Sequence, residues 1–289
     1  MQKSNPKKEI FKKQTQDLPG LEKKMDPRPE FDNELEGKNR LNGKKCIITG
    51  GDSGIGRAVA IAFAKEGADV AIIHLPAEKE DSEFTVKYIS EKYNRKCISV
   101  ATDISSEANC RKAVEDIVAV FGRVDVLVNN AAVQYPMDDF LKITTQNLVE
   151  TFSVNIFAMF WLTQGVIPYM TKGSVIINTT SVTAYRGSSS LVDYSSTKGA
   201  IVSFTRSLSA NLVDKGIRVN AVAPGPVWTP LIPATFDEEH VQKFGTDVPM
   251  KRPGQPVEVA PAYVFLAGRD SDYITGQVIH VNGGEIING

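Results

Sequence analysis

Tyr194 and Lys198 are the two side chains of this sequence that could together move a proton. They stand four residues apart at the start of an expected helix, so both lie on one helix face. A free tyrosine titrates at about pH 10, and a cation beside it favours the phenolate. In a chain with eight tyrosines, a Tyr-xxx-Lys pair also arises by chance. The pair therefore indicates chemistry only together with other residues.

Two further polar residues accompany this pair. Ser181 comes just after an expected strand, at the strand end where open α/β sheets bind ligands. Asn155 lies in a strongly apolar helical segment, where an amide side chain needs a hydrogen-bond partner.

A glycine-rich stretch, Thr-Gly-Gly-Asp-Ser-Gly-Ile-Gly at 49–56, joins an expected strand to an expected helix. Glycines at such a turn let the backbone approach a pyrophosphate, whose charge is favoured at a helix N-terminus. A tight turn without a ligand needs the same residues, so the loop alone does not decide its role. Its spacing is not GxGxxG, and no Gly-Lys-[Ser/Thr] follows, which disfavours an ATP-type P-loop.

Short β-rich runs alternate with helical segments from residue 44 onward, which is typical of βαβ units in a parallel sheet. Strands are expected at 44–49, 69–74, 96–102, 124–129, 174–180, 218–222 and 277–281, and helices at 54–66, 82–93, 106–121, 145–170, 196–214 and 256–267. The pattern predicts an α/β fold: a single Rossmann-type, doubly wound, parallel seven-stranded sheet with helices on both faces.

Residues 1–40 differ from the rest, with ten Lys or Arg, eight Asp or Glu and few large apolar residues. Such a segment cannot offset its ordering entropy by burial of its own. We expect an extended N-terminal arm docked on the folded surface, with a disordered tail as the alternative. The chain then divides into the arm, 1–40, and one domain, 41–289.

Bulk composition narrows the function classes. The net charge of −1 gives no reason to expect nucleic acid or an anionic membrane as partner. No apolar run reaches ten residues and no signal peptide precedes the domain, so a cytoplasmic protein is expected. Three scattered cysteines and three scattered histidines predict no metal site.

Taken in order, these motifs resemble the short-chain dehydrogenase/reductase family. The resemblance rests on TGxxxGIG at 49–56, Asn-Asn-Ala at 129–131, Asn155, Ser181, Tyr194 with Lys198, and Pro224-Gly225. It covers about residues 41–289. The extension, with Pro19-Gly20 and Met25-Asp26-Pro27-Arg28-Pro29, looks like a bacterial subgroup associated with general stress and sporulation.

The resemblance implies a catalytic tetrad. Tyr194 would donate or accept the proton, and Lys198 would lower the pKa of Tyr194 and bind the nicotinamide ribose. Ser181, with Tyr194, would hold the substrate oxygen, and Asn155 would support a water-mediated proton relay. The implied activity is hydride transfer between a nicotinamide cofactor and a small alcohol or carbonyl compound, with polyols and sugars among the candidates.

The same resemblance implies a set of cofactor contacts along the sheet edge. They are Gly50, Asp52, Ser53, Gly54, Ile55, Gly56, His74, Leu75, Asp103, Ile104, Asn130, Ala131, Ala132, Tyr194, Lys198, Pro224, Gly225, Val227 and Thr229. Ala132 departs from the family, which usually has glycine there, and its methyl group would crowd or shift the ribose contact.

The end of the second expected strand bears on the choice between NAD and NADP. An acid there binds the free 2′-hydroxyl of NAD, whereas an arginine pairs with the 2′-phosphate of NADP. Here His74 and Leu75 occupy these positions, and the glycine loop offers Asp52 and Ser53 rather than a cation. Because a buried phosphate without a cation is costly, we expect NAD. NADP stays an alternative, since Lys79 or a protonated His74 could pair with the phosphate.

Two functions of different class follow. The first is a reversible alcohol dehydrogenase or carbonyl reductase, with the apolar segment 227–250 closing over a small substrate. The second is a dinucleotide-binding stress or spore-associated protein without turnover, against which the intact tetrad argues. Residues 156–162 contain no polar side chain, so the helix is apolar all round and predicts a covering subunit. We expect a homotetramer, as in the family.

Overall fold

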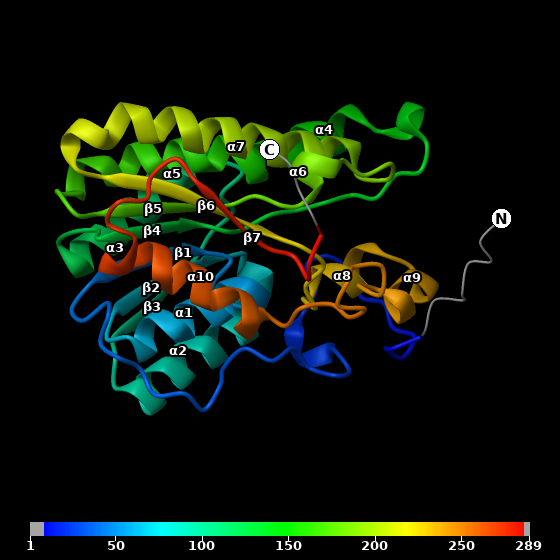
Figure 1. Ribbon diagram of the computed structural model, residues 1–289, viewed down its shortest axis with the longest axis horizontal. Coiled ribbons are helices and arrows are strands. Elements are labelled where there is room, and N and C mark those ends of the chain that lie inside the picture. The colour runs from blue at the N-terminus through cyan, green and yellow to red at the C-terminus, as the bar shows by residue number, and fades with distance from the viewer. Residues whose placement is uncertain (1–8, 286–289) are drawn as a thin grey trace.

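A seven-stranded parallel sheet organises the computed structural model, which describes residues 9–285 (Figure 1). Its strands lie in the order β3-β2-β1-β4-β5-β6-β7. They are β1 (Lys45–Thr49), β2 (Asp69–His74), β3 (Cys97–Ala101), β4 (Val126–Asn129), β5 (Val175–Thr179), β6 (Arg218–Pro224) and β7 (Val278–Val281). The predicted fold class is confirmed.

The central strands form because their residues are β-branched and apolar on both faces, as buried parallel strands require. All six residues of β2 are buried, and Ile48 of β1 pairs in register with Ile72 of β2 and Val128 of β4. Strand β1 thus has β2 on one side and β4 on the other, which is the point where the strand order reverses. Ligands bind at such a point, beyond the carboxyl ends of the strands.

Helices cover both faces of the sheet. The helices α1 (Gly54–Lys65), α2 (Lys79–Tyr93) and α10 (Pro256–Ala267) pack on one face. On the other face lie α3 (Glu107–Phe121), α4 (Thr145–Phe152), α5 (Ala158–Val166) and α7 (Val192–Leu212). Two apolar cores result, one on each side of the sheet.

Several helical segments differ from expectation. The predicted helix 145–170 is interrupted: a π-helical turn, Ser153–Phe157, separates α4 from α5, and a 3-10 turn, Ile167–Tyr169, follows. Helix α7 begins at Val192, earlier than expected, so Tyr194 lies in its first turn. The expected covering segment contains two short helices, α8 (Leu231–Thr235) and α9 (Glu238–Lys243), and a third short helix, α6 (Thr183–Arg186), follows β5.

Between residues 9 and 44, the described part of the segment before β1 runs over the surface in an extended form, with a 3-10 turn at Glu22–Lys24. It contacts the α8–α9 region, where Phe11 stacks on Trp228 with ring centroids 3.8 Å apart. Farther along, Asp32 accepts hydrogen bonds from Lys92 at 2.7 Å and Tyr88 at 2.8 Å. The sequence pattern predicted an arm anchored at points such as Phe11, but not the residues that each anchor contacts.

Crossing a lipid bilayer needs a longer and more apolar helix than any found within residues 9–285.

Candidate active site

A cavity of about 1100 Å³ opens at the carboxyl ends of the strands. Its wall includes every predicted cofactor contact except Gly56, together with Ser181. The structure therefore brings together residues that lie as far apart in the sequence as Gly50 and Thr229. The place is the one that the reversal of strand order predicts.

Tyr194, Ser181 and Lys198 meet in this wall. The side chains of Tyr194 and Ser181 share a hydrogen bond. The Ser181 hydroxyl oxygen also accepts the backbone N–H of Thr183 at 3.2 Å, which fixes its position. The ammonium of Lys198 lies 5.2 Å from the centroid of the Tyr194 ring and donates to the carbonyl of Thr179 at 3.0 Å.

Burial shifts both titrating groups toward their neutral forms. It raises the pKa of Tyr194 to about 12, and the hydrogen bond from Ser181 opposes that rise. Burial lowers the pKa of Lys198 to about 7. Ser181 is thus the neighbour that favours the Tyr194 phenolate in the protein without cofactor. The expected lowering of the Tyr194 pKa by Lys198 stays a prediction.

Asn155 lies behind the cavity wall, fully buried in the π-helical turn. Its amide oxygen accepts the N–H of Val133 at 2.8 Å, and its amide nitrogen donates to the Val133 carbonyl at 2.9 Å and to the Thr197 hydroxyl at 3.1 Å. The predicted partner for this buried amide is thus found. Asn155 holds the chain after β4 beside the first turns of α7, which carries Tyr194.

The glycine loop approaches the cavity through its backbone. Gly50 and Gly54 have φ angles of +63° and +52°, which residues with a side chain rarely adopt. A Cβ at Gly56 would overlap the Gly50 carbonyl, so Gly56 packs helix α1 against the loop rather than lining the cavity. The backbone cradle and the cavity fit a dinucleotide, whose pyrophosphate would lie at the start of α1.

Asn130 links the glycine loop to β4, a neighbour of β1 in the sheet. Its side-chain amide donates to the Thr49 carbonyl at 3.1 Å, while the Thr49 hydroxyl accepts the backbone N–H groups of Asn130 and Ala131 at 2.8 and 3.0 Å. These bonds tie the ends of β1 and β4 together. Ala132 follows on the cavity wall.

The carboxyl groups of Asp52 and Glu78 lie at the end of β2, which is formed by His74 and is followed by Leu75. Both oxygens of the Asp52 carboxylate are buried without a hydrogen bond of normal geometry, and Asp52 lines the cavity. Glu78 accepts the N–H of Leu75 at 2.9 Å and also lines the cavity. Burial and the charge of Asp52 raise the pKa of Glu78 to about 8. Sequence reasoning missed Glu78, although Pro76 signalled a turn that returns the chain to this strand end.

The segment after β6 covers the opposite side of the cavity. Leu231, Ile232 and Phe236 line it, as predicted for an apolar cover. Trp228 instead packs against the N-terminal segment, and its indole N–H donates to the Pro27 carbonyl at 2.8 Å. Three residues of that segment, Leu18, Pro19 and Gly20, line the cavity, which composition alone could not predict.

Comparison with known sequences shows relatives along almost the whole chain. The NADPH-dependent aldehyde reductase 1 of Arabidopsis thaliana is 51% identical and covers 93% of this chain and 96% of its own. General stress protein 39 of Bacillus subtilis is 52% identical, with 93% and 94% covered. The glucose and ribitol dehydrogenase of Daucus carota is 51% identical, with 94% and 95% covered.

Solved structures show the same architecture. A short chain dehydrogenase from Burkholderia cenocepacia in complex with NADP has a TM-score of 0.80 and 31% identity, covering 85% of this chain and 98% of its own. A 3-ketoacyl-(acyl-carrier-protein) reductase from Brucella melitensis with NADH has a TM-score of 0.76 and 34% identity, with 84% and 98% covered. A sequence profile described as Enoyl-(Acyl carrier protein) reductase matches residues 50–285. With its parallel sheet and its Ser181, Tyr194 and Lys198 in one cavity wall, this chain belongs to the short-chain dehydrogenase/reductase family of oxidoreductases.

Proposed function

We propose that this oxidoreductase interconverts a small alcohol and its carbonyl compound, with Tyr194 as the acid/base. The observation that carries the proposal is the meeting of Tyr194, Ser181 and Lys198 on one wall of the large cavity. A bound nicotinamide cofactor would supply or accept the hydride.

In the reducing direction, the Ser181 hydroxyl would hold the carbonyl oxygen while Tyr194 transfers its phenolic proton to it. Lys198, already buried beside the ring, would stabilise the phenolate that remains once a ribose hydroxyl also orients its ammonium. Asn155 would fix the first turns of α7 through Thr197 and support the return of a proton from water. In the oxidising direction each proton moves the opposite way.

The cavity around Tyr194 combines polar and apolar side chains, which supports a small polar substrate such as an aldehyde, a polyol or a sugar. Gln134, Gln146 and Glu150 line it together with Leu191 and Phe236. The names of two relatives, an aldehyde reductase and a glucose and ribitol dehydrogenase, fall in this class.

The test is nicotinamide absorbance at 340 nm across a panel of aldehydes, polyols and sugars, run in both directions with both cofactors. Turnover of one compound class supports the proposal. Tight cofactor binding without turnover of any compound would favour the second candidate, a non-catalytic dinucleotide-binding stress protein. The relative named General stress protein 39 supports membership of the stress-associated subgroup, and the cytoplasmic location expected from the sequence stays a prediction.

NAD is the cofactor that we propose this chain prefers. Asp52 and Glu78 line the cavity at the end of β2, and a 2′-phosphate bound beside these two carboxyl groups would be unfavourable. Lys79 is exposed and pairs with Glu83 at 3.7 Å. Solved relatives bind NADP or NADH, so the family allows either. Affinities for both cofactors at pH 6 and pH 8 test this, and NADP binding about tenfold tighter than NAD at pH 8 would contradict it.

A homotetramer is our proposed assembly, with the α4–α5 surface at an interface. Phe157 and Phe160 are 44% and 45% exposed, whereas Ile156 and Met159 on the same segment are buried. Large apolar side chains exposed side by side are typical of subunit contacts. Light scattering that shows a monomer would contradict this assignment.

A further inference from the structure

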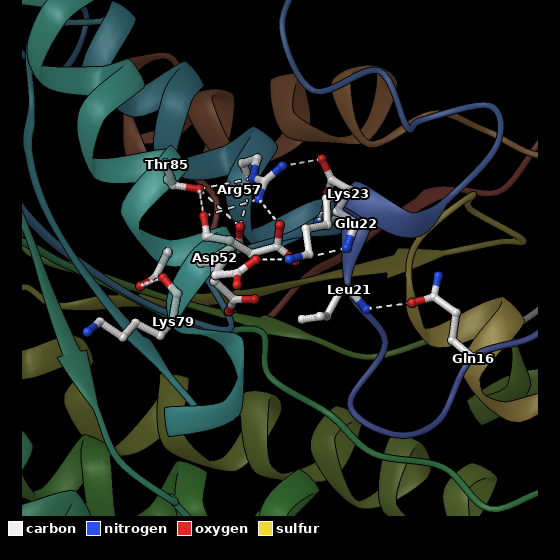
Figure 2. A network of polar contacts seen from close by, with 12 residues as sticks. Gln16, Leu21, Glu22, Lys23, Asp52, Arg57, Lys79 and Thr85 are labelled. Carbon is white, nitrogen blue, oxygen red and sulfur yellow. Dashed lines mark hydrogen bonds and ion pairs between the residues drawn. The ribbon is translucent and has the colours of Figure 1, made fainter.

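Glu22, in the 3-10 turn of the N-terminal segment, reaches the start of the helix that follows the glycine loop. One carboxylate oxygen accepts the backbone N–H of Gly54 at 2.7 Å, and the other pairs with the guanidinium of Arg57. Gly54 is the first residue of α1, so one of the N–H groups left unpaired at this helix end is satisfied from outside the domain. Figure 2 shows Glu22 pointing at Arg57 beside Asp52.

A buried polar network holds this contact. Glu22 is 1% exposed and Arg57 3%. Arg57 also pairs with the Asp81 carboxylate at 3.1 Å and donates to the carbonyl of Asp52 at 2.7 Å and the hydroxyl of Thr85 at 2.9 Å (Figure 2). The backbone N–H of Glu22 donates to Asp81 at 2.8 Å. The network therefore joins the N-terminal segment, the glycine loop and α2 at one point.

The residues immediately before Glu22 belong to the cavity itself. Leu18, Pro19 and Gly20 line it beside Gly54 and Pro230. A Cβ at Gly20 would overlap the Pro230 carbonyl, so the segment passes close to the backbone of the covering region. The N–H of Leu21 donates to the Gln16 side chain at 2.9 Å, which fixes the bend between these residues and Glu22 (Figure 2).

We propose that Glu22 is a positioning residue of the dinucleotide site, supplied by the N-terminal arm. It holds Gly54 and Arg57, and through them the loop whose backbone faces the pyrophosphate, in the conformation that binds the cofactor. Without it, binding must order the loop, and affinity falls by that cost. The inference rests on the proposed function, because it requires that the cavity bind a dinucleotide.

The test compares Glu22→Ala with Glu22→Gln. The first removes the acceptor for Gly54, whereas the second keeps an acceptor and removes the charge. Calorimetric titration with NAD and with NADP should show the dissociation constant of Glu22→Ala raised about tenfold, and that of Glu22→Gln within about threefold of wild type. At saturating cofactor, kcat should stay within about twofold while KM for the cofactor rises.

A matched control lies elsewhere on the same arm. Asp32 anchors it to Lys92, Tyr88 and Tyr93, away from the cavity. Asp32→Asn should lower Tm without changing the dissociation constant, which separates docking of the arm from positioning of the loop.

Two outcomes would overturn the proposal while the wild type binds cofactor. In one, Glu22→Ala loses Tm but keeps wild-type affinity, so that Glu22 serves stability alone. In the other, both Glu22 variants bind more tightly, so that the carboxylate repels the pyrophosphate. A wild type that binds neither NAD nor NADP would overturn the proposed function and this inference together.

Discussion

Lys198 and Arg57 are both buried basic side chains, but only Lys198 lines the cavity, and their surroundings differ in kind. Arg57 faces two carboxylates, Glu22 and Asp81. Lys198 has a backbone carbonyl and the face of Tyr194 as its neighbours, and burial lowers its pKa to about 7. Among residues 9–285, no carboxylate forms an ion pair with Lys198. The charge of Arg57 is thus compensated by carboxyl groups of the protein, whereas a charge on Lys198 is not.

The difference separates a structural charge from a chemical one. Removing either partner from a compensated buried pair leaves the other charge unpaired, so such pairs resist change and hold elements together. A buried lysine without a counter-ion is unfavourable for stability, and it gains stabilisation when a polar ligand arrives. We therefore propose that the Arg57 network positions the glycine loop, and that Lys198 and Tyr194 serve the substrate and the cofactor.

Tyr194→Phe should produce the largest effect, because it deletes the transferred proton and keeps the ring beside Lys198. We expect kcat to fall about a thousandfold or more, with cofactor affinity within a few fold of wild type. Steady-state rates and cofactor titration measure both. The control is Tyr185→Phe, which removes a phenolic hydroxyl outside the cavity wall and keeps the ring that contacts His280. Near-normal turnover by Tyr194→Phe would show that another group is the acid/base.

Lys198→Ala should damage both binding and rate, since one ammonium is proposed to serve the ribose and the phenol. A loss of about a hundredfold in kcat/KM is expected, shared between a weaker dissociation constant and a lower kcat. Cofactor affinity measured by calorimetry is the decisive value. If the cofactor affinity were unchanged, Lys198 would not bind the ribose. Lys198 would then differ from Arg57 only by its part in the chemical step.

Much of the fold and of the cavity wall could be predicted from the sequence, because local patterns carry them. The seven strands follow from short apolar β-branched runs, and the pair Tyr194 and Lys198 from its spacing with Ser181. The interruption at Asn155 could not be predicted, because apolar periodicity does not distinguish an α-helix from one that contains a π-helical turn. The physical signal was the amide itself, which needed partners outside its own helix.

The arm contacts were beyond sequence reasoning for a different reason. Glu22 is one of eight acids among the first forty residues, and nothing local marks it as the one that meets Arg57. Such pairings depend on tertiary geometry between segments far apart in the chain. Glu78 was missed likewise, because its position at the end of β2 depends on how the turn after Leu75 is closed.

Deleting residues 1–38 tests the structural side of the comparison. The deletion removes Glu22, the packing of Phe11 and Met25 near Trp228, and the Asp32 hydrogen bonds. We expect Tm to fall by about 5–10 °C, since several kcal/mol of packing and polar contacts are lost. Calorimetric scans with and without cofactor measure this. An unchanged Tm would mean that the segment is a tail, as the alternative interpretation of its composition holds.

Glu22→Gln should produce the smallest effect, and it appears as a pH dependence. Burial raises the pKa of Glu22 to about 7, against the lowering effect of Arg57 and Gly54, while Asp81 and Asp52 add to the rise. A carboxyl group whose pKa is higher in the folded than in the unfolded state stabilises the fold when it is protonated. This contribution is complete below about pH 4.5, the ordinary pKa of the group, and is lost as the pH rises through about 7. The wild type should therefore lose stability across this window relative to Glu22→Gln, by on the order of 2 kcal/mol. Denaturant unfolding at pH 4.5, 6 and 7.5 measures the difference between the two proteins. A constant difference at all three values would mean that Glu22 is charged throughout, and that Arg57 compensates it as fully as it does Asp81.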